Sequence, residues 1–444
     1  MKKRQFTALF TATEWWPLSA RLAIRFLERG CKVAALCPRG HVLNAVSGIG
    51  KIYPYYRFDS MAGLEKALEA ETPDLVVPCD DRAAWQLHDL HQRKPRYREL
   101  IESSLGPASQ YSRLRSRVRL LDHAAGLGLR VPETVEVHAE PDIRAWFSGR
   151  SQPAVLKIDG TWGGNGVEVV HSAEEGLAAF KRLRRPLRRS LAWKRLLVNN
   201  DPIAFWSQSR LDAISVSLQE YIVGRPATLM LACWRGELLG LVSAEVLCTQ
   251  GKTGASTIVR LVRNEEMAHA ARRLVETLGL SGFHGLDFML EEGTDAAYLI
   301  ELNARCTQLG HLSLAGQGDL AGLLCHRLGF GGAESAGPLA AGEIVSFFPQ
   351  ALVWNPDSPY LRQAHMDIPV NEPKLVKELQ RPLWPERQWS ARLYGLLFPK
   401  ERTARARTEE ASPRSDSPMP QDSNGAPSSS GLGKAGNMTN RTPA

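Results

Sequence analysis

The sequence lacks the patterns of a disulfide-stabilised, zinc-binding or membrane-spanning protein. Its seven cysteines are scattered, odd in number and without a Cys-x-x-Cys pair, which argues against a disulfide framework and a zinc ribbon. No apolar run is long enough to span a bilayer. The basic start Met1–Arg4 is followed by Glu14 and Pro17 before any long apolar run, so we predict no signal peptide. Together these absences predict a protein of the reducing cytoplasm.

Length and charge limit the possible functions but do not identify a ligand. The 444 residues, 43% of them hydrophobic and 23% charged, can bury a large core and suggest two to four domains. The net charge of +8 favours anionic partners, and nucleotides, nucleic acids and acidic membranes all qualify. Past Arg402 the chain has almost no large apolar residue, which predicts a disordered tail.

The first hundred residues alternate between strand and helix patterns. Apolar strands are predicted at Phe6–Phe10, Lys32–Leu36 and Asp74–Pro78, and helices at Ser19–Arg29 and Met61–Ala70. This order predicts a domain with a parallel sheet. The first strand-to-helix turn contains no glycine, so the Gly-x-Gly-x-x-Gly that seats a dinucleotide is absent. We therefore expect a scaffold or substrate-side domain.

Farther along the chain, the sequence predicts helices at Ser112–Leu129, Glu265–Leu278 and Leu312–Leu328.

A glycine-rich hairpin between Val155 and Val170 is the first segment that indicates a ligand. Lys157 lies in the strand that leads into its loop, and four glycines follow: Gly160, Gly163, Gly164 and Gly166. An ordinary hairpin with a long loop is the competing interpretation. Four glycines exceed what a turn requires, and glycines let backbone N–H groups approach phosphate oxygens. No Walker motif occurs elsewhere.

A second segment carries oxygen ligands on a predicted strand pair. Glu301 and Asn303 are two residues apart, so their side chains share one face of a strand, and Asp287 reaches the same space from the neighbouring strand. Each of them alone fits a solvated strand face. All three beside Arg305 indicate magnesium held by hard oxygen ligands.

Both segments, in this order, resemble the ATP-grasp superfamily over about Ser112 to His326, and residues 1 to 105 are similar to the βα domain that precedes the grasp in many members. The resemblance implies a mixed α/β and α+β fold. It divides the chain into a Rossmann-like domain (1–107), a two-lobed ATP-grasp domain (108–330, with a flap lobe at about 130–222 and a metal-binding lobe at about 223–330), a C-terminal extension packing on the grasp (331–400) and a disordered tail (401–444).

The same resemblance implies roles for individual residues. Arg305 and Lys157 are the implied catalytic residues, and Asp287, Glu301 and Asn303 the implied metal ligands. The implied nucleotide contacts are Arg117, Lys157, Gly160, Gly163, Gly164, Gly166, Gln219, Glu220, Tyr221 and Ile222. Two positions depart from the family pattern: Arg117 stands where many members have lysine, and Pro226 where an acid holds the ribose.

The implied activity is that of a ligase that uses ATP and Mg²⁺, or Mn²⁺ in its place, to convert a carboxylate into an acylphosphate and join it to an amine or another nucleophile. The fold does not determine the substrates. Cys306, Gln308 and His311 follow the metal ligands and are candidates for substrate contact, each with a competing structural role. The partners are small molecules, with no membrane, and the apolar stretch Glu343–Trp354 is a candidate homodimer interface.

Two alternatives stay open. A nucleotide-binding scaffold without catalysis is favoured by Pro226 and by the arginine at position 117. A nucleic-acid-binding protein is the less favoured alternative, based on eight basic residues between Lys181 and Arg195 with Trp193 among them. A solvated helix face is the more common use of such a run.

Replacing Arg184, Arg185, Arg188 and Arg189 by glutamine tests the nucleic-acid alternative. If the basic run is a solvated face, ligase activity should stay nearly unchanged. Loss of tight, salt-sensitive binding to RNA or DNA, with the log–log salt slope reduced by roughly three to four units, would instead establish the nucleic-acid function.

Overall fold

The computed structural model describes residues 5–56, 59–158, 166–184, 215–251, 254–316, 318–330 and 337–389. Its first sheet has four parallel strands in the order β3-β2-β1-β4, formed by β1 (Thr7–Thr11), β2 (Lys32–Cys37), β3 (Lys51–Pro54) and β4 (Leu75–Pro78). Helix α1 (Ser19–Glu28) covers one face, and α2 (Ser60–Glu71), α3 (Asp81–Arg93) and α4 (Arg98–Leu105) cover the other. Burial on both faces explains why these strands read as continuous apolar runs. We call this part the first domain.

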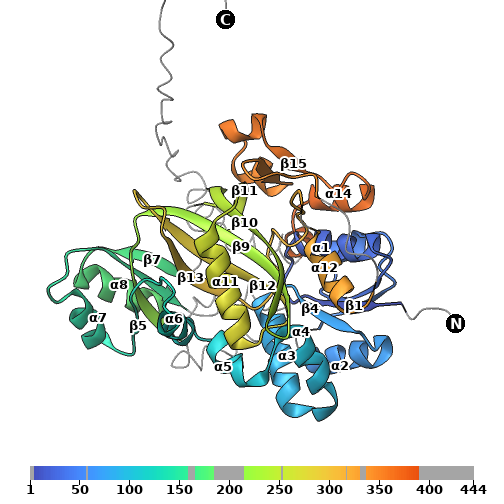
Figure 1. Cartoon of the computed structure of the whole chain (residues 1–444), viewed down its shortest axis with the longest axis horizontal. Helices are drawn as coiled ribbons and strands as arrows, with labels where there is room; N and C mark the ends of the chain where they lie inside the picture. Colours follow the sequence, from blue (N-terminus) through green and yellow to red (C-terminus); the bar gives the residue numbers. More distant parts are fainter. Residues whose placement is uncertain are drawn as a thin grey trace, which may run out of the picture.

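A second, antiparallel sheet forms the flap lobe. Its order is β5-β8-β6-β7, from β5 (Thr134–Glu136), β8 (Val216–Glu220), β6 (Ala154–Ile158) and β7 (Val167–Val170). Helices α7 (Glu140–Phe147) and α8 (Ala173–Leu183) pack on it around a core that includes Ile143, Leu156 and Leu177. Figure 1 shows this lobe at one end of the molecule and the first domain at the other.

The large sheet lies between them, in the order β13-β12-β9-β10-β11-β14-β15. Its strands are β9 (Gly224–Trp234), β10 (Glu237–Thr249), β11 (Ser256–Val262), β12 (Gly282–Glu291), β13 (Ala297–Asn303), β14 (Ile344–Phe347) and β15 (His365–Asp367). Helices α6 (Arg117–Gly126) and α11 (Glu265–Leu278) cover one face, and α11 lies in front of the sheet in Figure 1. The other face shares a core with the first domain, where the rings of Phe26 and Phe283 meet edge to face at 6.0 Å.

The C-terminal extension enlarges this sheet as well as packing on it. Strands β14 and β15 are its last two members, and Asp367 of β15 binds Arg21 of the first domain at 2.7 Å and His311 at 3.1 Å. All three side chains lie largely out of water, so this ion cluster ties the extension to α1. The remaining elements are α5 (Tyr111–Leu114), α12 (Leu320–Arg327), α13 (Gln350–Trp354), α14 (Pro373–Leu379), α15 (Trp384–Arg387) and the 3-10 helices η1 (Val42–Ala45), η3 (Pro95–Tyr97), η4 (Ala108–Gln110) and η6 (Pro359–Arg362).

The predicted fold class is confirmed, with local corrections. The single helix expected from Ser112 to Leu129 is wrong, because Ser116 accepts a hydrogen bond from Arg119 N and so caps a new helix, α6. The helix expected at Leu312–Leu328 is likewise reduced to α12, which begins after its own cap, Asp319. The domain boundaries at residues 107, 330 and 400 stay our proposal, and the predicted tail lies outside the described residues. Within the described ranges, no helix is long and apolar enough to cross a membrane.

Gly282, at the start of β12, should be sensitive to substitution because it has φ +83° and a Cβ there would lie 2.1 Å from Ser104 O of the first domain. Gly282→Ala should lower the unfolding free energy by about 3 kcal/mol through backbone strain and overpacking. Gly149→Ala is the matched control, since Gly149 has φ +75° with no atom within 4 Å of its Cβ position, and should cost about 1 kcal/mol. Urea unfolding measures both losses of unfolding free energy. Equal losses in the two variants would contradict the close contact between β12 and the first domain.

Candidate functional site

The β12–β13 hairpin brings the three predicted metal ligands together. Asp287 pairs directly with Glu301, and Asn303 follows on the same face two residues later. The Asn303 amide donates a hydrogen bond from Nδ2 to Asp287 Oδ2 at 3.0 Å. Thr228 of β9 stands opposite Asp287 on its other side and hydrogen-bonds the same carboxylate. The pattern of alternate strand residues was therefore interpreted correctly.

Gly285 makes room for the loop that follows this hairpin. It stands opposite Asn303, and a Cβ at this position would lie 2.4 Å from Thr307 Cγ2. Thr307 in turn contacts the Met230 sulfur at 3.3 Å through its hydroxyl. A side chain at 285 would push this loop away from the sheet.

Two arginines from separate elements reach Asp287, Glu301 and Asn303, which we call the oxygen cluster. The Ser116 cap places Arg117 at the first position of α6, and its Nη2 lies 2.9 Å from Glu301 Oε2. Arg305, just beyond β13, donates from Nη2 to Asn303 Oδ1 at 3.0 Å and from Nε to Asp81 Oδ1 at 2.8 Å. Neither Asp81 nor Thr228 was predicted. Asp81 could have been found, because it follows the carboxyl end of the parallel strand β4, where ligands of such sheets gather.

Lys157 belongs to the same group although it comes from the flap lobe. It is 8% exposed in β6, and its Nζ donates to Gln219 Oε1 of β8 at 2.5 Å. Gln219 donates in turn to Thr134 Oγ1 at 3.1 Å. The predicted residue Gln219 therefore holds the lysine in place from the adjacent strand.

Burial and neighbouring charges shift the pKa values of the two carboxylates in opposite directions. Burial alone would raise the pKa of Glu301, but Arg117, Lys157 and Arg305 together hold that pKa below its usual value. Burial and the neighbouring Glu301 raise the pKa of Asp287 to about 6, against hydrogen bonds from Thr228 and Asn303 and the charge of Arg305. One carboxylate is thus kept charged, and the other ionises only near neutral pH.

The segment Glu220–Ile222, which the resemblance implies contacts the nucleotide, connects the two lobes. Glu220 ends β8, its N–H donates to Glu133 O at 2.8 Å, and its carboxylate accepts from Glu133 N at 3.2 Å. Ile222 is buried and Tyr221 is 38% exposed, while Gly224 begins β9. A single stretch of extended backbone thus passes from the flap-lobe sheet to the large sheet.

Part of the predicted phosphate loop lies outside the described residues, namely Gly160, Gly163 and Gly164. Gly166 is described: it has φ +79° and its carbonyl accepts from Ile158 N at 3.0 Å, closing the hairpin of β6 and β7. The basic run is described only as far as Arg184. Lys181 pairs with Glu140 at 2.9 Å and Arg182 with Glu168. These pairs fit the solvated-face interpretation of that run.

The three candidates for substrate contact have structural partners. The N–H of buried Cys306 donates to Pro78 O at 3.2 Å, which joins the loop after β13 to the first domain. Gln308 donates to the Ser256 hydroxyl, and His311 belongs to the ion cluster with Asp367. For His311 the packed-imidazole alternative is the one observed.

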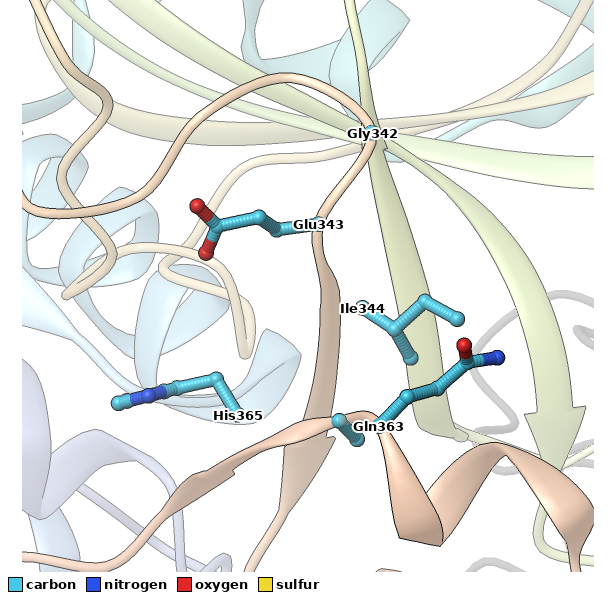
Figure 2. A pocket seen from close by; sticks show the side chains of 6 residues that line it. Gly342, Glu343, Ile344, Gln363 and His365 are labelled. Atoms are coloured by element: carbon cyan, nitrogen blue, oxygen red, sulfur yellow. The ribbon is translucent and has the colours of Figure 1, made fainter.

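A cavity of about 400 Å³ lies elsewhere, in the C-terminal extension. In Figure 2 the side chains of Glu343 and His365 lie on one side of it, and those of Ile344 and Gln363 on the other. Its lining residues are Gly342, Glu343, Ile344, Gln363, Ala364 and His365, and the cavity contains none of the predicted site residues. The candidate site is therefore the charged cluster of β12, β13, α6 and β6.

Comparison with known proteins agrees with the ATP-grasp resemblance. A family model described as an ATP-grasp domain matches residues 201–308, a range that includes Glu220–Ile222, the three predicted metal ligands and Arg305. The chain contains an ATP-grasp domain. A search of curated protein sequences finds no match.

Solved ATP-grasp relatives share the fold at low sequence identity. N5-carboxyaminoimidazole synthetase from Staphylococcus aureus, complexed with ADP, is 15% identical with a TM-score of 0.53, covering 78% of this chain and 82% of its own. Carboxyaminoimidazole ribonucleotide synthase from Aspergillus clavatus, complexed with ATP, is 14% identical with a TM-score of 0.54, covering 77% and 80%. The biotin carboxylase domain of Hydrogenobacter thermophilus 2-oxoglutarate carboxylase, with MgADP and bicarbonate, is 12% identical with a TM-score of 0.55, covering 77% and 74%. The ATP-grasp fold thus extends beyond the matched domain.

Asp287 should make the stability of the metal-free ATP-grasp protein depend on pH. Because its folded-state pKa of about 6 is raised by burial, the neutral carboxyl stabilises the fold at low pH, and this contribution is lost as the pH rises through about 6. In EDTA, Asp287→Asn should match the wild type near about pH 3.5, below the ordinary pKa of an unfolded Asp, and exceed it by about 2 kcal/mol at about pH 7.5, a shift of some two pKa units discounted for partial exposure. Thermal unfolding measures this difference. A difference that does not change with pH would contradict the assigned pKa.

Proposed function

We propose that this protein is an ATP- and Mg²⁺-dependent ligase that activates a carboxylate as an acylphosphate and joins it to an amine or another nucleophile. ADP and phosphate are the other products. One observation carries the proposal: Asp287, Glu301 and Asn303 share one face of the β12–β13 strand pair, and three cationic side chains from different elements act on Glu301. Oxygen ligands beside converging cationic side chains at a lobe interface are suited to binding a metal ion together with phosphate groups.

The oxygen donors suit magnesium bound together with a nucleotide. Among the residues with described positions, no cluster of three or more His, Cys, Asp or Glu side chains forms a metal cage. Mg²⁺ is usually held by one or two carboxylates and completed by substrate phosphates and water. Asp287 and Glu301 would supply the two carboxylates, and Asn303 a neutral oxygen. Bound Mg²⁺, or Mn²⁺ in its place, would neutralise phosphate charge.

The remaining residues position the nucleotide. Lys157 brings a positive charge from the flap lobe, and Gly160, Gly163, Gly164 and Gly166 would let backbone N–H groups approach the phosphates. The adenine would lie along Glu220, Tyr221 and Ile222, where the backbone passes between the lobes. Pro226 offers the ribose no acid, and Met289 is its cross-strand partner. Ribose contacts must therefore come from other residues.

The first chemical step transfers the γ-phosphoryl group. A carboxylate oxygen of the substrate attacks the γ-phosphorus, a new O–P bond forms, and the bond to the β,γ-bridging oxygen breaks to release ADP. Arg117 and Arg305 offset the negative charge at the transferred group, and catalysis of such steps consists mainly of positioning and charge stabilisation. In the second step an amine attacks the acyl carbon, phosphate leaves with the C–O electron pair, and the nitrogen loses a proton.

A non-catalytic nucleotide-binding scaffold is the second candidate. Arg117 already forms an ion pair with Glu301 at 2.9 Å, so in this state a predicted metal ligand is engaged by a guanidinium. Catalysis would require this arginine to turn from the carboxylate to a phosphate. The scaffold becomes the better description if nucleotide binds and no acid is activated.

We further propose cytoplasmic localisation and a homodimer. All seven cysteines are free thiols, six of them buried, as expected in a reducing compartment. In the stretch Glu343–Trp354, the helix α13 exposes Leu352, Val353 and Trp354, which are 43%, 68% and 42% exposed. These side chains support an interface there.

Acylphosphate trapping tests the ligase function. Purified protein with ATP, Mg²⁺, hydroxylamine and a panel of amino acids and small carboxylic acids should yield a hydroxamate and ADP with at least one acid, because hydroxylamine intercepts activated acyl groups. Glu301→Gln should lower this rate roughly 100-fold or more, since it removes a charged metal ligand. Glu292→Gln, at an exposed position in the turn of the same hairpin, is the matched control and should keep the wild-type rate.

Two outcomes would contradict this account. Wild-type turnover in Glu301→Gln would remove the metal assignment while leaving the ligase class intact. Nucleotide binding by calorimetry with neither hydroxamate nor ADP across a broad panel would favour the scaffold.

A further inference from the structure

Asp81 connects the first domain to the arginine at the proposed phosphoryl-transfer site. It is the first residue of α3, and its Oδ1 lies 2.8 Å from Nε of Arg305, 224 residues later in the chain. Both side chains are partly buried, with exposed fractions of 29% for Asp81 and 18% for Arg305. An ion pair that is also hydrogen-bonded and shielded from water orients its partners better than an exposed pair does.

The contact continues as a chain into the oxygen cluster. Arg305 donates from Nη2 to Asn303 Oδ1 at 3.0 Å, and Asn303 donates from Nδ2 to Asp287 Oδ2 at 3.0 Å. The orientation of the Asn303 amide is thus set from both sides. Arg305 makes one longer contact, 3.5 Å from Nη1 to Cys306 O. Of its five N–H donors, two then have no partner among the residues described, and they suit a phosphoryl oxygen.

Both ends of this chain are anchored. Asp80, the cap of α3, accepts hydrogen bonds from Ala83 N at 2.9 Å, Thr13 N at 2.6 Å and Thr13 Oγ1 at 2.8 Å. The start of α3 is therefore fixed to the turn after β1. On the other side, the hydrogen bond from Cys306 N to Pro78 O holds the loop of Arg305 against the end of β4.

We propose that Asp81 is a positioning residue for the reaction: it holds the Arg305 guanidinium in the orientation that meets the transferred phosphoryl group. This inference rests on the proposed ligase function. Without Asp81, the charge of Glu301 would draw the guanidinium toward the metal ligands, and the geometry for transfer would be lost. The first domain then contributes to phosphoryl transfer itself as well as to substrate binding.

Steady-state kinetics separate this role from a structural one. Asp81→Ala should lower kcat roughly 10- to 100-fold, the usual cost of losing a partner that orients a reacting group, with the KM for ATP changed less than about threefold. Asp81→Glu should recover part of the rate, because it restores the charge. Asp89→Ala is the matched control: Asp89 lies in the same helix and pairs with Arg115 at 2.8 Å, and its loss should leave kcat unchanged. Unchanged kcat in Asp81→Ala would overturn the proposal.

A double-mutant cycle shows whether Asp81 acts through Arg305. In an Arg305→Ala background, Asp81→Ala should lower kcat by less than about a further twofold, since the group that Asp81 orients is already gone. The same loss in both backgrounds would show that Asp81 acts by another route and would overturn the proposal. Thermal unfolding of each variant identifies any loss that comes from an unfolded fraction.

Binding of MgADP with aluminium fluoride, a mimic of the transferred phosphoryl group, separates this proposal from the ligase function because it needs no acid substrate. Asp81→Ala should weaken binding of this complex at least about 10-fold. The affinity for MgADP without aluminium fluoride should change by less than about twofold. Equal affinities in wild type and variant would overturn only the role of Asp81. A wild type that binds the complex but activates no acid would overturn only the ligase function, and a wild type that binds no nucleotide would overturn both.

Discussion

The central constraint in this protein is electrostatic: two carboxylates stand opposite each other on adjacent strands, and both are only partly exposed to water. Asp287 and Glu301 cannot both be charged there without nearby positive groups. Arg117, Lys157 and Arg305 supply that charge from a helix, the flap lobe and the loop after the hairpin. The proposed site thus depends on three separate elements arriving at one place, and a bound metal ion would take over part of their role.

The packing of the molecule explains how these elements are held. The large sheet buries one face against α11 and α6, which presents Arg117, and the other face against the first domain. Asp81 contacts Arg305, and Pro78 accepts a hydrogen bond from Cys306 N, where these parts join at the carboxyl end of β4. The short segment between β8 and β9 joins the flap-lobe sheet to the large sheet. Lys157 reaches the cluster from that lobe, so its position depends on the lobe's orientation.

Much of the fold was predictable from local patterns, and most of the contacts around the site were not. The shared face of Asp287, Glu301 and Asn303 followed from the period of two along β13, and the bounds of α11 were predicted correctly from its helical periodicity. The short strands β3, β14 and β15 were missed because three or four residues carry too little pattern. The contact between Asp81 and Arg305 joins residues far apart in the chain, and only tertiary packing brings them together. The helix expected across Ser116 failed because one capping side chain outweighed a continuous helical pattern.

The most direct test of the ligase account is the fate of oxygen in the acid substrate. Once a reactive acid is known, its carboxylate can be labelled with ¹⁸O and the released phosphate examined by mass spectrometry or ³¹P NMR after turnover. If the carboxylate attacks the γ-phosphorus and a nucleophile then displaces phosphate, one labelled oxygen per turnover passes to phosphate. Phosphate that takes its new oxygen from water, with the acid's label fully retained in the product, would show that ATP is hydrolysed without an acylphosphate and would contradict the account.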